Sequence, residues 1–166
     1  MNKLFLITGP PGIGKSTISK ELAFNLKKSA LIEGDDIYHQ VIGSYHSPWH
    51  ELNHLETFWK VSLNMIELYL KDGYDVVFNY IITQEDYNKI KKTINNDINL
   101  TVLLSDKETL LKRDKMREED CRMNERCLLL LEKFLSYNYD KKDILYTDNL
   151  TIKETVDKIL KRSNYE

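Results

Sequence analysis

One octapeptide near the start of the chain constrains the fold more than any other feature. Residues 9–16 read Gly-Pro-Pro-Gly-Ile-Gly-Lys-Ser, which matches the pattern G-x-x-x-x-G-K followed by Ser or Thr. A short apolar run, Leu4–Thr8, precedes the match, and apolar residues at helical spacing follow it over about Lys15–Lys28. In such a loop the glycines aim backbone N–H groups at phosphates, next to the positive end of the helix dipole. We therefore expect this loop to bind the phosphates of a nucleotide.

The residues of the loop have distinct predicted roles. Lys15 should reach the β- and γ-phosphates, Ser16 should ligate magnesium, and Thr17 should touch the α-phosphate. The guanine signature Asn-Lys-x-Asp is absent, because Asn88-Lys89 is followed by Ile90-Lys91. ATP with Mg²⁺ is therefore the predicted cofactor pair. The predicted nucleotide-binding residues are Gly9, Gly12, Ile13, Gly14, Lys15, Ser16 and Thr17.

Predicted strands and helices alternate along the rest of the chain. Further strands are expected at Ala30–Glu33, Tyr74–Ile82, Leu100–Leu104 and Ile144–Thr147. Further helices are expected at His54–Lys71, from Thr83 to about Asn95, over Lys107–Tyr139 with a break at 119–123, and from Thr151 onward. Capping-box spacing marks two of the helix starts, Thr83 with Asp86 and Thr151 with Glu154. The alternation predicts an α/β fold in one domain over 1–166, a doubly wound five-stranded parallel sheet flanked by helices. Ligands bind such sheets at the carboxyl ends of the strands.

Composition limits the class of partner. The chain has 24 Lys and Arg against 26 Asp and Glu, so no basic excess indicates nucleic acid as the main partner. The two cysteines, Cys121 and Cys127, have neither a metal-ligand spacing nor the density of a disulfide scaffold. No apolar run is long enough for a membrane span or a signal-peptide core. We expect a cytoplasmic protein without a membrane partner, as a monomer or a homodimer.

Two aspartates directly follow the second predicted strand. Asp35 and Asp36 should therefore lie at the same rim of the sheet as the phosphate-binding loop. A carboxylate at that place can accept a hydroxyl proton or hold magnesium through water. The alternative interpretation is a helix N-cap pair. We predict that Asp35 is the base and, with Ser16, a magnesium ligand, and that Asp36 belongs to the acceptor site.

The loop and the segment Ile32-Glu33-Gly34-Asp35-Asp36 together resemble the small kinases of the nucleotide-kinase-like P-loop group. This group includes gluconate, shikimate and adenylylsulfate kinases and chloramphenicol phosphotransferase. In gluconate and adenylylsulfate kinases a Gly-Asp after the second strand positions the acceptor hydroxyl, and Gly34 and Asp35 match it here. The resemblance implies an enzyme that uses ATP and Mg²⁺ to phosphorylate a hydroxyl of a small molecule.

Some departures from the group leave the subfamily open. No Asp-Gly-x-Pro-Arg follows the third predicted strand, as it would in an adenylate-kinase type, and no glycine cluster stands there as in shikimate kinases. That strand contains Asn79 where an acidic Walker B residue is expected. Either Asp35 carries the magnesium role alone, or the metal rests mainly on Ser16 and the phosphates.

Four arginines border the predicted helix break. Arg113 and Arg117 are four residues apart on one helical face, as are Arg122 and Arg126. The segment at about 113–126 resembles the lid of these kinases, whose arginines neutralise the transferred phosphoryl group and exclude water. We predict that Arg113 and Arg117 are catalytic. The alternative is surface pairing with the acidic neighbours Asp114, Glu118, Glu119 and Asp120.

An aromatic insert at about 36–73 contains all four histidines. His50 and His54 are four residues apart, but Pro48 interrupts the region and no cysteine or paired carboxylate completes a zinc site. The favoured interpretation is an acceptor pocket with aromatic and polar walls, and plain packing is the alternative. The predicted acceptor-binding residues are Asp36, Tyr38, His39, Trp49 and Trp59.

The predicted reaction is transfer of the γ-phosphoryl group of ATP to an acceptor hydroxyl. Lys15, the loop amides and Mg²⁺ hold ATP, and Asp35 orients or deprotonates the acceptor. One alternative is a nucleoside, nucleotide or polynucleotide-end kinase, with a base stacked on Trp49 or Trp59. The other is an ATP-binding sequestration or switch protein with little transfer activity, which Asn79 favours.

Overall fold

The computed structural model describes residues 2–116, 119, 122 and 124–165. Its strands are β1 (Lys3–Thr8), β2 (Ser29–Glu33), β3 (Asp75–Asn79), β4 (Asp97–Leu104) and β5 (Ile144–Tyr146). They form a five-stranded sheet in the order β2-β3-β1-β4-β5, and every pairing is parallel. The predicted doubly wound sheet is therefore confirmed.

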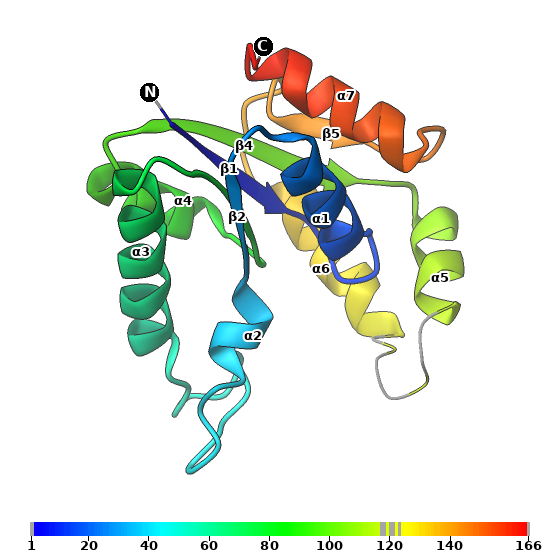
Figure 1. The fold of residues 1–166 in the computed structure, drawn as a ribbon. Coiled ribbons are helices and arrows are strands. Elements are labelled where there is room, and N and C mark those ends of the chain that lie inside the picture. The colour runs from blue at the N-terminus through cyan, green and yellow to red at the C-terminus, as the bar shows by residue number, and fades with distance from the viewer. Residues whose placement is uncertain (1, 117–118, 120–121, 123, 166) are drawn as a thin grey trace.

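The helices are α1 (Lys15–Asn25), α2 (Gly34–Tyr38), α3 (Leu55–Lys71), α4 (Gln84–Thr93), α5 (Lys107–Lys115), α6 (Glu125–Ser136) and α7 (Ile152–Arg162). The connection from β1 to β2 runs across the sheet opposite to the later ones. Right-handed crossovers therefore place α1 on one face and α3 and α4 on the other, as Figure 1 shows. Helix α7 packs against α1. Within the described ranges, no helix has the length and apolar character needed to cross a membrane.

Both predicted capping boxes are present, at Thr83 with Asp86 and at Thr151 with Glu154. Several predicted ends shift by a few residues. The third strand ends at Asn79 rather than Ile82, because its neighbours β2 and β1 end beside it and leave no partner strand. The long helix predicted after β4 is divided into α5 and α6 at the expected break.

The central strand explains why the first residues read as a continuous apolar run. Residues Leu4–Thr8 of β1 are fully buried, with β3 on one side and β4 on the other. Helices cover both faces of this strand, so its side chains are apolar on both faces and do not alternate between apolar and polar. The phosphate-binding loop thus begins at the end of the most deeply buried strand.

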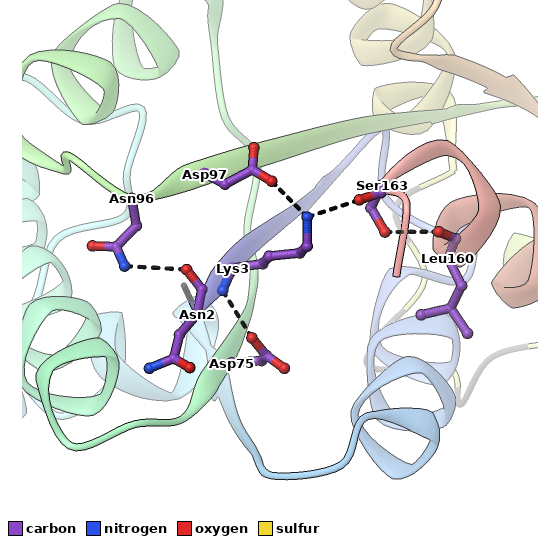
Figure 2. Close-up of polar contacts among 7 residues, drawn as sticks. All are labelled: Asn2, Lys3, Asp75, Asn96, Asp97, Leu160 and Ser163. Atoms are coloured by element: carbon purple, nitrogen blue, oxygen red, sulfur yellow. Dashed lines mark hydrogen bonds and ion pairs between the residues drawn. The ribbon is translucent and has the colours of Figure 1, made fainter. Parts of the chain in front are cut away.

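The amino-terminal rim of the sheet is fastened by polar contacts, most of which Figure 2 shows. The Lys3 ammonium donates to Asp97 Oδ2 at 2.7 Å and to the Ser163 carbonyl at 2.9 Å. Asp75 accepts from the Lys3 backbone N–H at 2.8 Å and from the Tyr165 hydroxyl at 2.9 Å. These contacts join β1, β3 and β4 to the chain that follows α7.

Candidate functional site

The loop between β1 and α1 lies at the carboxyl end of the central strand. Gly9 has a φ of 145°, and a Cβ at this position would collide with the Leu103 carbonyl oxygen. Only glycine therefore allows the chain to turn so close to β4. Lys15 Nζ donates to the carbonyl oxygens of Gly9 at 3.0 Å and Pro10 at 3.1 Å, which holds its ammonium group against the loop.

A carboxylate that the sequence analysis did not single out lies next to Ser16. The Ser16 hydroxyl donates to Glu33 Oε2 at 3.1 Å, and the Asn79 side-chain amide donates to the same oxygen at 2.6 Å. Glu33 and Asn79 are the last residues of β2 and β3 and are paired in register. The acidic group in contact with Ser16 is thus Glu33. The sequence signal that could have identified Glu33 is that two neighbouring parallel strands end in polar residues, Glu33 and Asn79.

Asp35 and Asp36 both lie in the first turn of α2, whose N-cap is Glu33, so neither aspartate is the N-cap. Both side chains are exposed, but only Asp35 lines the cavity described below. Gly34 brings this turn close to β3, since a Cβ there would lie 2.6 Å from the Tyr80 ring and 2.9 Å from the Asn79 carbonyl oxygen. The two aspartates therefore face different surroundings.

Tyr80 is a further member of the site that the sequence analysis missed. Its side chain is buried, and its ring lies 4.4 Å from that of Phe58, centroid to centroid. Burial raises the pKa of the Tyr80 phenol well above its usual value, and the negative charge of Asp35 raises it further. The phenol is therefore neutral at physiological pH and can donate a hydrogen bond.

A cavity of about 1080 Å³ joins the loop to the aromatic insert. Its wall contains twelve residues that the sequence predicted for the site: Gly12, Ile13, Gly14, Lys15, Ser16, Thr17, Asp35, Tyr38, His39, Trp49, Trp59 and Arg113. Gly9 and Asp36 do not line it, and Arg117 lies outside the described residues. One chamber therefore contains nearly all of the predicted nucleotide and acceptor residues.

Arg113 lies where the phosphate-binding loop lines this cavity. Its guanidinium donates to the Thr147 hydroxyl at 2.9 Å, to the Thr147 carbonyl at 3.0 Å and to the Ile13 carbonyl at 3.3 Å. The alternative prediction, surface pairing of the arginines with acidic neighbours, requires an exposed Asp114. Asp114 is instead buried, and it accepts a hydrogen bond from the Asn124 backbone N–H at 2.8 Å. The start of the predicted lid is therefore tied to the loop, to β5 and to the chain before α6.

Two distant segments of the chain are in contact at the aromatic insert. The guanidinium carbon of Arg126 in α6 lies 3.4 Å from the centroid of the Trp49 ring in the insert. Arg126, Leu130 and Lys133 share one face of α6, and all three line the cavity. Arg126 was predicted at the helix break and not in the site, because its partner Trp49 is 77 residues earlier in the chain.

The insert is ordered by its own aromatic residues. The Tyr38 ring stacks on His54 with centroids 4.0 Å apart, and its hydroxyl donates to the His46 carbonyl at 2.8 Å. His54 Nε2 lies 2.9 Å from the Tyr38 carbonyl oxygen. Tyr38 and His54 thus brace the insert against α2. Among the residues that the structure describes, no group of three or more His, Cys, Asp or Glu could hold a metal ion.

Solved structures with this fold include several small P-loop proteins. A tunicamycin resistance protein from Deinococcus radiodurans is 14% identical, with a TM-score of 0.76 over 100% of this chain and 98% of that one. A sugar kinase from Janibacter is 13% identical, with a TM-score of 0.71 over 99% and 96%. A gluconokinase from Sinorhizobium meliloti is 15% identical, with a TM-score of 0.70 over 98% and 91%. These similarities confirm the fold of the small P-loop kinases that the sequence resembled.

A family model described as an AAA domain matches residues 4–129. The matched region starts in β1 and extends into α6, so it contains the phosphate-binding loop, Glu33, Asp35 and Arg113. It covers most of the chain. The protein therefore belongs to this AAA domain family of P-loop proteins.

Proposed function

We propose that this protein transfers the γ-phosphoryl group of ATP to a hydroxyl group of a small molecule. The observation that carries the proposal is the shared cavity, in which Lys15 and Asp35 lie in one wall with the aromatic insert. Its volume of about 1080 Å³ is slightly above the roughly 300–1,000 Å³ typical of ligand pockets. It therefore has room for a nucleotide and an acceptor together.

The donor end of the cavity has the chemistry for a triphosphate. The loop presents backbone N–H groups at the start of α1, and Lys15 adds a positive charge that the phosphates would draw from the loop carbonyls. Arg113 is held against Ile13 and Thr147 on the same side. We assign Arg113 to nucleotide binding, and the lid role of Arg117 stays a prediction.

Ser16 and Glu33 fit a magnesium ion. A hydroxyl and a carboxylate 3.1 Å apart offer the hard oxygen ligands that Mg²⁺ prefers, and the Asn79 amide orients the carboxylate. Bound Mg²⁺ would neutralise the charge on the β- and γ-phosphates. Glu33 then supplies the acidic group expected of a Walker B residue, so Asn79 no longer favours a switch protein, and Asp35 is left for the acceptor.

In the proposed reaction Asp35 receives the acceptor proton. The acceptor oxygen bonds to the γ-phosphorus, the bond from that phosphorus to the β–γ bridging oxygen breaks, and ADP leaves with the electron pair. Tyr80, neutral beside Asp35, can donate a hydrogen bond to the acceptor and orient its hydroxyl. This arrangement puts the base and the phosphoryl donor in contact with one cavity.

The test is ADP release with Mg-ATP and a panel of sugar acids, nucleosides, nucleoside monophosphates and hydroxyl-bearing antibiotics. Asp35→Asn should lower acceptor-dependent release by about 10²–10⁴-fold, the usual effect of removing a general base. Asp36→Asn is the matched comparison, because Asp36 lies in the same turn and does not line the cavity. Equal losses in both variants, or full activity of Asp35→Asn, would contradict the role given to Asp35. ATP binding without any acceptor-dependent release would favour sequestration.

A further inference from the structure

We propose that the acceptor is an alcohol that carries both a flat ring and an anionic group. The inference rests on the proposed function and concerns the acceptor half of the same cavity. Two independent features of that half carry it. One is an aromatic wall, defined as Tyr45, Trp49, Trp59 and Tyr80, and the other is the cationic face of α6.

Two members of the aromatic wall, Tyr45 and Trp49, present ring surface that the fold leaves open. Trp49 is 63% exposed and Tyr45 is 41% exposed, although both belong to the cavity lining. Tyr80 in the wall and Phe58 nearby are packed and buried, so the exposure is a local feature of Tyr45 and Trp49. Exposed large apolar groups inside a concave site favour a ligand that covers them, and flat rings cover aromatic faces best.

The cationic face, defined as Arg126 and Lys133, adds positive charge that no described acidic residue pairs with. Of the four basic side chains that line the cavity, Lys15 and Arg113 contact the loop. Arg126 and Lys133 form no ion pair with any residue that the structure describes. The acidic lining groups are Asp35 and Asp86. Two cations in a cleft with so little opposing charge favour an anionic ligand.

Asp86 lines the same cavity and carries a negative charge, but its carboxylate has partners of its own in the capping box of α4. Its Oδ2 accepts from the Thr83 hydroxyl at 2.6 Å and from the Thr83 backbone N–H at 3.0 Å. Asp35 is assigned to the acceptor hydroxyl. The acceptor therefore meets Asp35 at its reacting end and, elsewhere, Arg126 and Lys133, which form no ion pair with a described residue.

Arg126 joins the two features. Its guanidinium carbon lies 3.4 Å from the centroid of the Trp49 ring, and a guanidinium held over a ring face can still donate hydrogen bonds from its N–H edge. That edge can bind a phosphate or carboxylate in bidentate fashion. Lys133 is seven residues farther along α6, roughly 10 Å away at 1.5 Å per residue, so it reaches a different part of the acceptor. Arg126 is thus the specificity residue for the anionic group.

Four matched acceptors separate the ring from the charge. Nucleoside monophosphates carry both, nucleosides lack the anion, ribose 5-phosphate lacks the flat ring, and ribose lacks both, while all four keep ribose hydroxyls. We expect acceptor-dependent ADP release to be highest for a nucleoside monophosphate. A short oligonucleotide with a free 5′-hydroxyl also carries flat rings and anionic groups. If it is the acceptor, its KM should depend steeply on salt concentration.

Variants at Arg126 and Trp49 test the residues. Arg126→Gln should raise KM for the ring-bearing anion by about 10–100-fold, the value of charged hydrogen bonds, with little change for the uncharged nucleoside. Arg126→Lys should restore only part of the loss, and Trp49→Phe should retain more affinity than Trp49→Leu. An unchanged KM for ATP in each variant shows that the fold is intact.

Several outcomes would overturn the inference. Ribose 5-phosphate or a sugar acid reacting better than every nucleoside monophosphate would remove the ring requirement. Equal reaction of nucleosides and their monophosphates would remove the anion requirement. A fall in kcat by the same factor for all acceptors in Arg126→Gln would place Arg126 on the transferred phosphoryl group instead. If a sugar acid is phosphorylated and Asp35→Asn abolishes that reaction, the proposed kinase stands while this inference fails.

Discussion

The two rims of the central sheet use the same kinds of side chain in opposite ways. At the amino-terminal rim, Lys3 and Asp75 satisfy their charges within the protein and fasten β1, β3 and β4 together, as Figure 2 shows in part. At the carboxyl rim, Lys15 and Asp35 line a cavity of about 1080 Å³. Charge paired inside the protein holds strands in place, whereas charge facing a cavity is available to a ligand. The comparison predicts that lysines at the two rims have separable effects.

The largest effect on turnover should come from replacing one lysine at each rim with alanine, in separate variants. Lys15→Ala should lower kcat/KM by about 10³-fold or more, because the Lys15 ammonium would no longer neutralise the negative charge of the transferring phosphoryl group. Lys3→Ala should leave turnover nearly unchanged and lower the free energy of unfolding by about 1–2 kcal/mol through its lost hydrogen bonds. ADP release and thermal unfolding, measured on both variants, check this. A Lys3 variant with the greater loss of turnover would break the comparison.

A smaller effect is expected at the proposed metal site. Glu33→Gln keeps the shape of the side chain but removes the charge beside Ser16, so the Mg²⁺ concentration for half-maximal ADP release should rise by about tenfold or more. Asp97→Asn is the control, because Asp97 is a carboxylate at the opposite rim. The same Mg²⁺ requirement in Glu33→Gln and the wild type would remove Glu33 from the site.

Close packing behind Asp35 gives the next prediction. Gly34→Ala places a methyl group 2.6 Å from the Tyr80 ring, so the ring or α2 must move, and the free energy of unfolding should fall by about 1–3 kcal/mol. Gly43→Ala is the matched control, since a Cβ at Gly43 meets nothing within 4 Å. Chemical denaturation measures both. Equal stability of the two variants would show that Tyr80 does not hold α2 in place.

The smallest effect concerns the pH dependence of stability at the amino-terminal rim. Burial raises the pKa of the Asp143 carboxyl, just before β5, above its usual value. The folded state then binds this proton more tightly than the unfolded state, so its contribution to stability is present below the unfolded pKa and is lost as pH rises through the folded pKa. Asp143→Asn should abolish that contribution. The difference in Tm between wild type and variant, followed from pH 4 to 8, should therefore favour the wild type more at the acidic end.

The sequence predicted what depends on local patterns. The phosphate-binding loop, both capping boxes and the break between α5 and α6 each depend on residues close together in the chain. The parallel sheet follows from the alternating order of strands and helices. The position of Asp35 at the carboxyl rim followed from the end of β2. Strand ends shifted where a neighbouring strand stopped, which a single segment does not reveal.

The contacts that the sequence did not predict join distant segments. Glu33 meets Asn79 only because β2 and β3 end in register, and Arg126 meets Trp49 only because the fold brings these two distant residues together. Tyr80 became a site residue because Gly34 lets α2 approach β3. Each depends on the register or packing of elements, for which a pattern along the chain carries no signal.

The most direct test of the central claim is to follow the γ-phosphorus of ATP by ³¹P NMR in the presence of an acceptor found on the panel. The account predicts that the γ signal is replaced by a phosphoester signal of the acceptor together with ADP, and that Asp35→Asn binds ATP but leaves the γ signal in place. Release of the γ-phosphorus as inorganic phosphate, or an unchanged spectrum with the wild-type protein, would contradict the proposal that donor and acceptor react in one cavity.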